Sequence, residues 1–230
     1  MQRQAIWRPA LERVWRAGLR WRFLLLQRHR YNRLALERVA GRPMVVLPQV
    51  FNPGLFFTSE FLVGLLGREP LPPGATVLDM GTGSGVGAVC AAAYAGRVVA
   101  VDINPAAVRC ARINALLNAV EARVEVRQGD LFAPVAGERF DLVLFNPPFF
   151  RGAPRDNLDR AWRSEDVVER FAAGLPAHLA SGGSALVILS TLADLPAFLR
   201  AFDGAGLAVE TVAERDMLSE TIVVYRLRPR

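Results

Sequence analysis

The sequence contains no lysine: all 28 of its basic residues are arginines, set against 22 acidic residues. Cysteine and histidine are also scarce, with two of each. Cys90 and Cys110 fall in predicted helices without a neighbouring histidine or further cysteine, which excludes a disulfide framework and a zinc-site signature. We interpret both as small buried apolar residues, and the sequence predicts no metal site.

Long hydrophobic runs are missing as well. Within residues 1–42 the longest apolar run is Phe23-Leu-Leu-Leu26, far below the ~20 residues that cross a membrane. Arginines interrupt any apolar centre that a signal peptide would need, so we expect a cytoplasmic protein. With 230 residues, 52% of them hydrophobic, the chain is long enough for one α/β domain with a full core.

Charge is distributed unevenly along the chain. Residues 1–42 hold 11 arginines against Glu12 and Glu37, a formal charge of +9. The remainder holds 17 arginines against 20 acidic residues, a formal charge of −3. We therefore divide the chain into a basic extension, 1–42, and a domain, 43–230.

The extension is expected to be helical. A second helix, from Tyr31 to Ala40, should end at Gly41 and Pro43. Three roles are open for the extension: a helical lid on the domain, a contact with nucleic acid or a ribosomal surface through Arg–phosphate pairs, or a helix on an anionic membrane surface. Apolar residues recur at spacings of four and three, which is typical of one helical face: Trp7, Leu11, Val14, Gly18, Trp21 and Leu25.

Polar side chains accompany four predicted strands between residues 77 and 145. Asp79, Asp102, Asp130 and Asn146 each lie near the carboxyl end of one strand. Open α/β sheets bind their ligands at this edge. The sequence therefore predicts a ligand site there.

The segment Asn146-Pro147-Pro148-Phe149 ends the fourth of these strands in an unusual way. The two prolines have no N–H and hold Asn146 and Pro147 extended, so the local carbonyls have no helix or ladder partner. An aromatic ring follows at once. Free acceptors beside a flat ring suit a planar group that carries an NH2, although these four residues alone also fit a plain rigid turn.

A glycine loop follows the first strand. Gly81, Gly83 and Gly85 let the backbone turn sharply and approach a ligand closely. The run from Gly83 to Ala88 also matches the dinucleotide-binding pattern, in which a helix N-terminus holds a pyrophosphate. Asp79 argues against this, because a carboxylate here would repel a pyrophosphate but could hold an ammonium group.

Residues from about 75 to 190 resemble a class I S-adenosylmethionine-dependent methyltransferase. The resemblance is strongest to the branch with an Asn-Pro-Pro-Phe/Tyr motif, which includes release-factor glutamine methyltransferases, small-domain ribosomal RNA guanine methyltransferases and N6-adenine methyltransferases. Ala161-Trp162-Arg163, followed by Val167-Val-Glu-Arg-Phe171, resembles the segment after this motif in release-factor-type enzymes.

This resemblance implies an α/β, Rossmann-like fold. We expect a seven-stranded, mostly parallel sheet with helices on both faces and a terminal antiparallel hairpin formed by strands at 208–213 and 221–227. A strand at 44–47 and a helix at 60–66, capped by Thr58 or Ser59, should precede the core. Residues 151–163 should form an irregular polar loop, one wall of the acceptor site.

S-adenosylmethionine is the implied cofactor. Asp102 lies where a carboxylate accepts ribose hydroxyls; otherwise it caps the next helix, which Asn104 could do instead. By resemblance, Asp130 accepts from the adenine amine or is simply a turn residue, and Ile103 and Leu131 enclose the adenine. The expected cofactor-binding residues are Thr58, in a segment that closes over the cofactor, Asp79, Gly81, Thr82, Gly83, Gly85, Asp102, Ile103, Asp130, Leu131 and Asn146.

The expected catalytic residues are Asn146, Pro147, Pro148 and Phe149. An amide or aryl-amine nitrogen attacks poorly because its lone pair is delocalised. The Asn146 side-chain oxygen and the Pro147 carbonyl would accept its N–H groups as charge develops on nitrogen, while Phe149 would stack on the acceptor. Both histidines fall in predicted helices far from the motif, so the proton would leave to water.

The sequence thus predicts methyl transfer to a protein glutamine, with a release factor or ribosomal protein as partner. The alternative is an exocyclic base amine, adenine N6 or guanine N2, in RNA or DNA, because both acceptors present a planar NH2. An NAD-dependent oxidoreductase would leave the Asn-Pro-Pro-Phe motif unexplained, and a non-catalytic module would not need every motif position intact.

Overall fold

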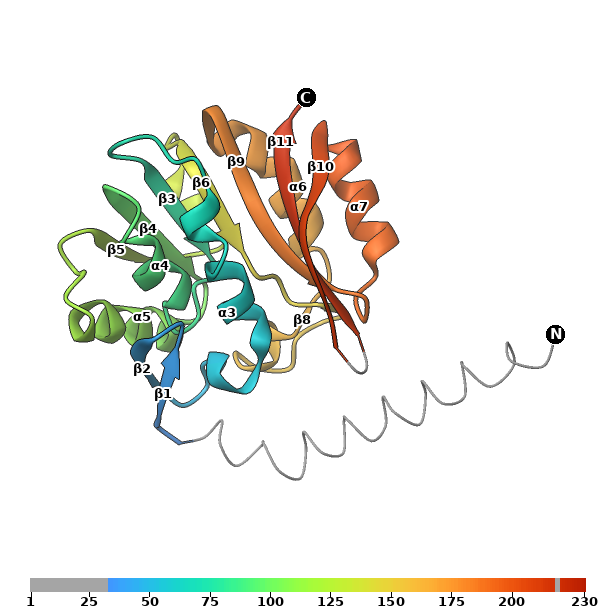
Figure 1. Ribbon diagram of the computed structural model, residues 1–230. Coiled ribbons are helices and arrows are strands. Elements are labelled where there is room, and N and C mark those ends of the chain that lie inside the picture. The colour runs from blue at the N-terminus through green and yellow to red at the C-terminus, as the bar shows by residue number, and fades with distance from the viewer. Residues whose placement is uncertain (1–32, 218–219) are drawn as a thin grey trace.

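A seven-stranded sheet forms the centre of the protein, for which a computed structural model describes residues 33–217 and 220–230 (Figure 1). The strand order is β10-β11-β9-β6-β3-β4-β5. β11 runs antiparallel to both neighbours, whereas β9, β6, β3, β4 and β5 are mutually parallel. The predicted mostly parallel sheet with a terminal antiparallel hairpin is confirmed. The strands are β3 (Thr76–Met80), β4 (Arg97–Asp102), β5 (Val124–Gln128), β6 (Phe140–Phe145), β9 (Leu179–Ser190), β10 (Leu207–Asp216) and β11 (Thr221–Pro229).

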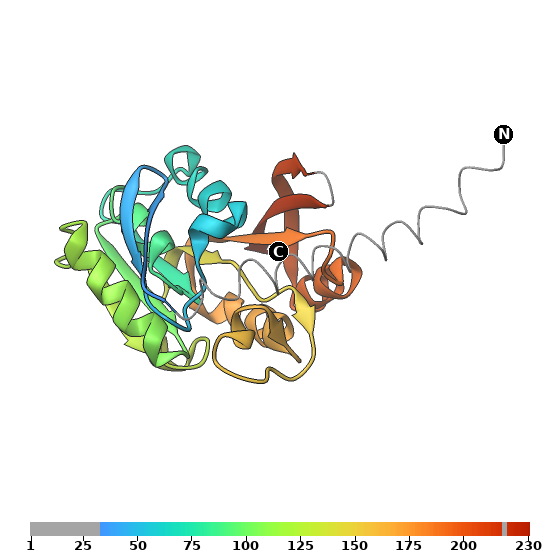
Figure 2. The ribbon, with the colours of Figure 1, turned by 90° about the horizontal axis from the view of Figure 1, so that it is seen from below.

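Helices cover both faces of this sheet (Figures 1 and 2). One face packs against α3 (Phe57–Val63), α4 (Val86–Ala91) and α5 (Pro105–Leu117). The other packs against α6 (Val167–His178) and α7 (Leu195–Gly204). Because both faces are covered, the inner strands are mostly apolar and buried. Short 3₁₀ helices lie in the connections: η2 (Pro53–Leu55), η3 (Leu66–Arg68), η4 (Ala133–Val135) and η5 (Asp159–Ala161).

The helix expected from Tyr31 to Ala40 is wrong over its described part. The chain forms a hairpin there, β1 (Ala35–Val39) and β2 (Arg42–Val46). Ala40 and Gly41 both have positive φ, 48° and 75°, and such two-residue turns match the twist of paired strands. The hairpin crosses the expected domain boundary at residues 42–43. The helix expected from Trp7 to Leu25 lies outside the described residues.

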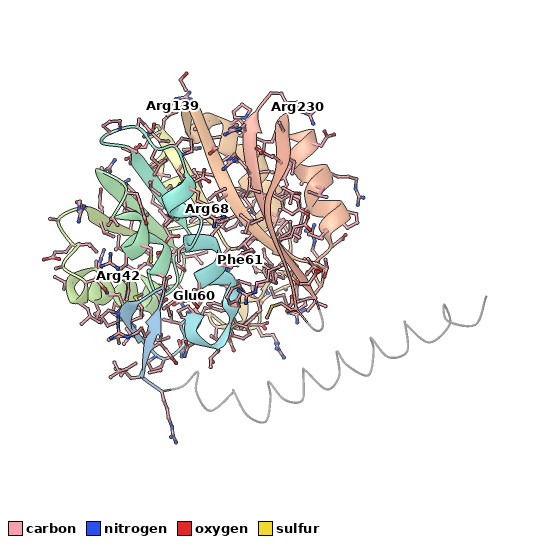
Figure 3. The ribbon with its side chains drawn as sticks, viewed as in Figure 1. Arg42, Glu60, Phe61, Arg68, Arg139 and Arg230 are labelled. Atoms are coloured by element: carbon pink, nitrogen blue, oxygen red, sulfur yellow. The ribbon has the colours of Figure 1, made fainter. Side chains whose placement is uncertain are left out.

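Side chains of the core hold this hairpin in place. Asn114 of α5 accepts a hydrogen bond from the Val45 N–H and donates one to the Val45 carbonyl, both at 2.7 Å. Glu60 of α3, beside the hairpin in Figure 3, accepts one from the Ala40 N–H at 3.2 Å. The hairpin thereby fixes the start of the segment 47–56, which continues into the site.

β9 is the longest strand of the sheet among the described residues and contains an irregularity. Its register against β6 shifts between Phe140 and Leu142, where Ser181-Gly182-Gly183 bulges out, and Gly182 has φ 77°. The glycine pair therefore lies inside a strand as a bulge.

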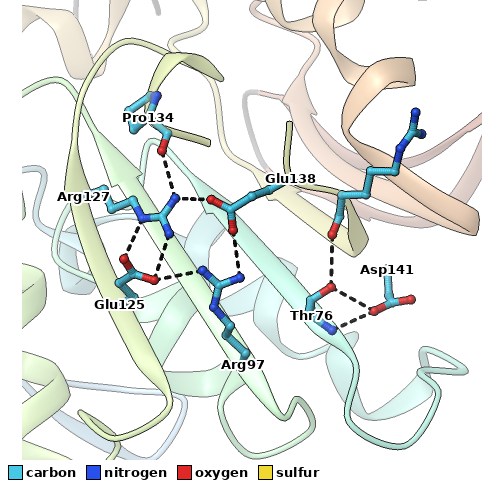
Figure 4. Close-up of polar contacts among 8 residues, drawn as sticks. Thr76, Arg97, Glu125, Arg127, Pro134, Glu138 and Asp141 are labelled. Carbon is cyan, nitrogen blue, oxygen red and sulfur yellow. Dashed lines mark hydrogen bonds and ion pairs between the residues drawn. The ribbon is translucent and has the colours of Figure 1, made fainter. Parts of the chain in front are cut away.

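Ion pairs link β4, β5 and the turn that precedes β6 (Figure 4). Arg97 pairs with Glu125 at 2.9 Å and with Glu138 at 2.8 Å, and Arg127 pairs with both acids. Hydrogen bonds from the two arginines lower the pKa of Glu125 to about 2. Exposed pairs of this kind each contribute at most about 1 kcal/mol. The carboxyl ends carry the cavity described next.

Among the helices of residues 33–217 and 220–230, none combines the length and the apolar character that crossing a membrane requires.

Candidate active site

A cavity of about 1200 Å³ opens at the carboxyl ends of β3, β4, β5 and β6. Its volume exceeds the ~300–1,000 Å³ of an ordinary small-molecule site, which leaves room for a second reactant. All but one of the expected site residues line it: Thr58, Asp79, Gly81, Thr82, Gly83, Asp102, Ile103, Asp130, Leu131, Asn146, Pro147, Pro148 and Phe149.

The exception is Gly85. It precedes α4 with φ 89°, and a Cβ there would lie 2.9 Å from the Ala111 Cα. This glycine therefore lets α4 approach α5, and it is not part of the cavity wall. Gly81 and Gly83, which do line the cavity, have φ of 62° and 56°.

Asp79 lies buried at the end of β3. Its Oδ2 accepts hydrogen bonds from the Thr82 hydroxyl at 2.5 Å and the Ala88 N–H at 2.8 Å. Burial raises the pKa of this carboxyl to about 6, against the opposing effect of the two hydrogen bonds. A Cβ on Gly87 would lie 2.3 Å from Oδ1, so the carboxylate is packed directly against α4.

Asp102 ends β4 and is held by backbone donors. The Gly83 N–H donates to Oδ2 and the Asn104 N–H to Oδ1, each at 2.8 Å. Desolvation is the main reason that its pKa is raised. Asn104 caps α5 by accepting from the Ala106 N–H at 2.9 Å, so Asp102 does not serve as that cap.

The residues after β5 form a third part of the wall. Asp130 is half-exposed and pairs with Arg170 of α6, N to O, at 2.7 Å. The Val167–Phe171 segment contains this arginine, but no local pattern indicated its pairing with Asp130, forty positions earlier in the chain. Ile103, 41% exposed, and Leu131 present apolar surface nearby in the same cavity wall.

Asn146 follows β6 and is half-buried. Its Nδ2 donates to the Thr58 Oγ1 at 3.2 Å. The expected capping role of Thr58 or Ser59 is wrong, because α3 begins at Phe57 and Phe56 occupies the cap position without a side-chain hydrogen bond. Thr58 is instead buried in the first turn, facing Asn146.

The segment 151–163 is more ordered than expected. β7 (Phe150–Arg151) pairs with β8 (Arg163–Ser164), and η5 lies between them. Much of the segment lines the cavity, as the sequence predicted. Within the segment, Asp159 pairs with Arg155 at 3.2 Å and with Arg163 at 3.6 Å, while Arg151 pairs with Glu169 of α6.

An aromatic cluster joins two distant parts of the cavity wall. The Trp162 ring lies 5.1 Å from that of Phe51 and 4.6 Å from that of Phe56, centroid to centroid. Phe51 and Phe56 are 5.1 Å apart. The sequence did not single out these phenylalanines, because isolated aromatic residues in a turn-rich link carry no periodic signal.

In sequence, residues 44–216 match the model of the methyltransferase small-domain family. The chain belongs to this family. A putative protein N5-glutamine methyltransferase of Methanocaldococcus jannaschii is 29% identical over 81% of this chain and 95% of its own length. A ribosomal protein L11 methyltransferase of Pelotomaculum thermopropionicum is 44% identical over 72% of this chain. A release factor glutamine methyltransferase of Cereibacter sphaeroides is 37% identical over 69% of it. The chain spans only 47% and 65% of these last two proteins.

Solved structures share the small-domain methyltransferase fold. The 16S rRNA N2 G1207 methyltransferase of T. thermophilus superposes with a TM-score of 0.66 at 24% identity, over 86% of this chain and 50% of that one. The E. cuniculi Mtq2-Trm112 structure superposes with a TM-score of 0.59 at 22% identity, over 79% and 99%. The protein is a methyltransferase. Its methyl donor is S-adenosylmethionine, the compound that the T. thermophilus structure contains.

The cavity residues fit this donor. The Asp102 carboxylate has about four acceptor positions, of which the hydrogen bonds from the backbone N–H groups of Gly83 and Asn104 use two. Two positions are left for a pair of neighbouring hydroxyls. The backbone at Gly81 and Gly83 carries no side chains, so the donor can approach it closely. The exposed Ile103 side chain offers an apolar surface for the adenine.

Proposed function

We propose that this methyltransferase transfers the methyl group of S-adenosylmethionine to the side-chain amide nitrogen of a glutamine in a protein, such as a release factor or ribosomal protein. The charge of the cavity carries the proposal. Within the described residues, seven acidic residues and four arginines line it. Sites that bind nucleic acid are strongly positive, whereas a glutamine amide is neutral. Relatives named as glutamine methyltransferases agree with this acceptor.

The arginines near the cavity mouth support a neutral acceptor as well. Arg151, Arg155, Arg163 and Arg170 all pair with acidic side chains. A phosphate would have to displace those carboxylates before it could bind. Of the arginines that line the cavity in the described part of the chain, Arg160 alone has no acidic partner.

The chain binds the donor through residues at three strand ends. Asp102 accepts the ribose hydroxyls, Asp79 faces the methionine ammonium directly or through water, and Asp130 accepts from the adenine amine. Arg170, the present partner of Asp130, must share that carboxylate with the adenine. Thr82 and the bare glycine backbone border the methionine portion.

The acceptor nitrogen is activated by the motif after β6. The donor, when bound, supplies a strongly electrophilic methyl group. The Asn146 Oδ1 and the Pro147 carbonyl accept the two N–H groups of the amide and thereby favour a pyramidal, nucleophilic nitrogen. Pro148 keeps the bend rigid and Phe149 stacks on the planar amide. Holding the nitrogen in line contributes several kcal/mol to the rate enhancement.

Methylation of an exocyclic base amine is the second candidate. The 11 arginines within residues 1–42 favour it, since such a segment can contact RNA phosphates or a ribosomal surface. We keep the division into an extension, 1–42, and a domain, 43–230, as part of this proposal. Acceptors from the translation machinery would place the enzyme in the cytoplasm.

One experiment separates the two acceptors. The enzyme is incubated with donor labelled in its methyl group, and with either purified release factor or ribosomal RNA. We expect label in the protein. Acid hydrolysis of the labelled protein should release the label as methylamine, because hydrolysis of a methylated side-chain amide frees its nitrogen substituent. Label in RNA alone, with none in release factor or ribosomal proteins, would contradict the glutamine proposal.

A further inference from the structure

The contact between Thr58 and Asn146 links two segments that are 88 positions apart. Thr58 is 8% exposed and lies in the first turn of α3, while Asn146 follows β6. The Asn146 Nδ2 donates to the Thr58 hydroxyl oxygen at 3.2 Å. A threonine side chain is stiff about χ1, so this oxygen is a well-placed anchor.

An asparagine amide has two unlike ends, and only one is useful here. The acceptor amide nitrogen carries N–H donors, so the Asn146 oxygen must face it. A flipped Asn146 would present N–H groups to N–H groups, with no acceptor between them. With Nδ2 bound to Thr58, the oxygen is the end that remains for the acceptor.

We propose that Thr58 is a positioning residue that acts through Asn146, by orienting its amide for the acceptor nitrogen. The inference deepens the proposed function and rests on it. It also separates Thr58 from donor binding: loss of its hydroxyl should slow methyl transfer while donor affinity stays the same.

Kinetics test this separation. Thr58→Val keeps the shape of the side chain and removes the hydroxyl, and Thr58→Ser restores it. The loss of one neutral hydrogen bond has a modest effect, so we expect Thr58→Val to lower kcat about fivefold, with KM and the calorimetric Kd for the donor unchanged. Thr58→Ser should recover most of kcat. Thr211→Val, at an exposed position of β10, is the matched control and should behave as wild type.

A double-mutant cycle shows whether the effect passes through Asn146. In an Asn146→Ala background, Thr58→Val should slow the residual transfer no further. Equal effects in both backgrounds, or a Thr58→Val enzyme with raised donor Kd and normal kcat, would overturn the proposal.

A spectroscopic readout does not depend on activity. In a ¹H–¹⁵N spectrum the Asn146 side-chain NH2 pair is identified by its loss in Asn146→Ala. Thr58→Val should move this pair, and Thr211→Val should not. A pair that stays in place refutes the contact. If the wild-type enzyme methylates no protein, the glutamine proposal fails, while this spectrum still decides the role of Thr58.

Discussion

The side chain of Asn146 sits where a strand end, a helix and the cavity meet. Its amide nitrogen donates a hydrogen bond to Thr58, so its oxygen is the group left to bind the acceptor. A rigid turn without a catalytic role would not need this oxygen. The interpretation of the motif as catalytic therefore depends on what happens when this one amide is removed.

We expect Asn146→Ala to lower kcat by about 10²–10³, the usual loss when one preorganised polar contact to a developing charge is removed. Calorimetry should find the donor Kd nearly unchanged, because the donor contacts lie mainly at β3, β4 and β5. Turnover equal to that of wild type would exclude the assigned role of Asn146.

A pH dependence follows from Asp79, whose pKa burial raises to about 6. Above pH 6 the carboxylate is charged and attracts the donor ammonium. Below pH 6 it binds a proton, and donor affinity should fall by up to about tenfold per pH unit. Calorimetric titrations between pH 5 and 8 measure this. Asp79→Asn should bind more weakly and with a flat profile in this range, whereas a variant that keeps the wild-type profile would assign the titration to another group.

At the scale of elements, the contact between α4 and α5 sets the shape of the glycine loop. Gly85 has φ 89°, and a Cβ there would lie 2.9 Å from the Ala111 Cα. Neither helix can withdraw easily, because both pack on the same face of the sheet.

Gly85→Ala should therefore reduce the free energy of unfolding by about 3 kcal/mol, from overpacking together with backbone strain. Gly137→Ala is a matched control, with φ 80° and nothing within 4 Å of the added Cβ. It should cost only the strain, about 1–2 kcal/mol. Urea unfolding of both variants measures the difference. Equal reductions in the free energy of unfolding would show that the close packing of α4 on α5 at Gly85 does not contribute to the cost of the substitution.

The sequence predicted poorly those elements and contacts that depend on residues far away in the chain. The core strands followed from their apolar runs and from the polar residue at each carboxyl end, which also located Asp102 and Asn146. The helix expected at 31–40 is a hairpin in its described part, and Asn114, 69 positions from Val45, holds this hairpin against the core. Trp162 and Arg170 were noted only as members of short motifs. Their partners, two phenylalanines and Asp130, could not be predicted because these are tertiary contacts that no local pattern reports.

For the whole molecule, donor binding and folding are coupled. The expected donor contacts come from the carboxyl ends of β3, β4 and β5, so an unfolded chain retains none of them. At a donor concentration of 100 times Kd, binding adds about 2.7 kcal/mol to the free energy of unfolding.

This gain should raise Tm by roughly 5–10 °C for a domain of this size. Thermal denaturation followed by circular dichroism, with and without S-adenosylmethionine, measures the shift. NAD at the same concentration is the control and should leave Tm unchanged, since Asp79 opposes a pyrophosphate at the glycine loop. A shift with NAD but not with S-adenosylmethionine would contradict the assignment of the donor.

The excess of carboxylates around the cavity also bears on turnover. The sulfur of the intact donor carries a positive charge, and that charge disappears once the methyl group has left. An acidic wall therefore attracts a fresh cofactor molecule more strongly than the spent one. The same carboxylates that favour binding of S-adenosylmethionine therefore favour release of its demethylated product. This difference in affinity promotes exchange of the product for a new donor molecule.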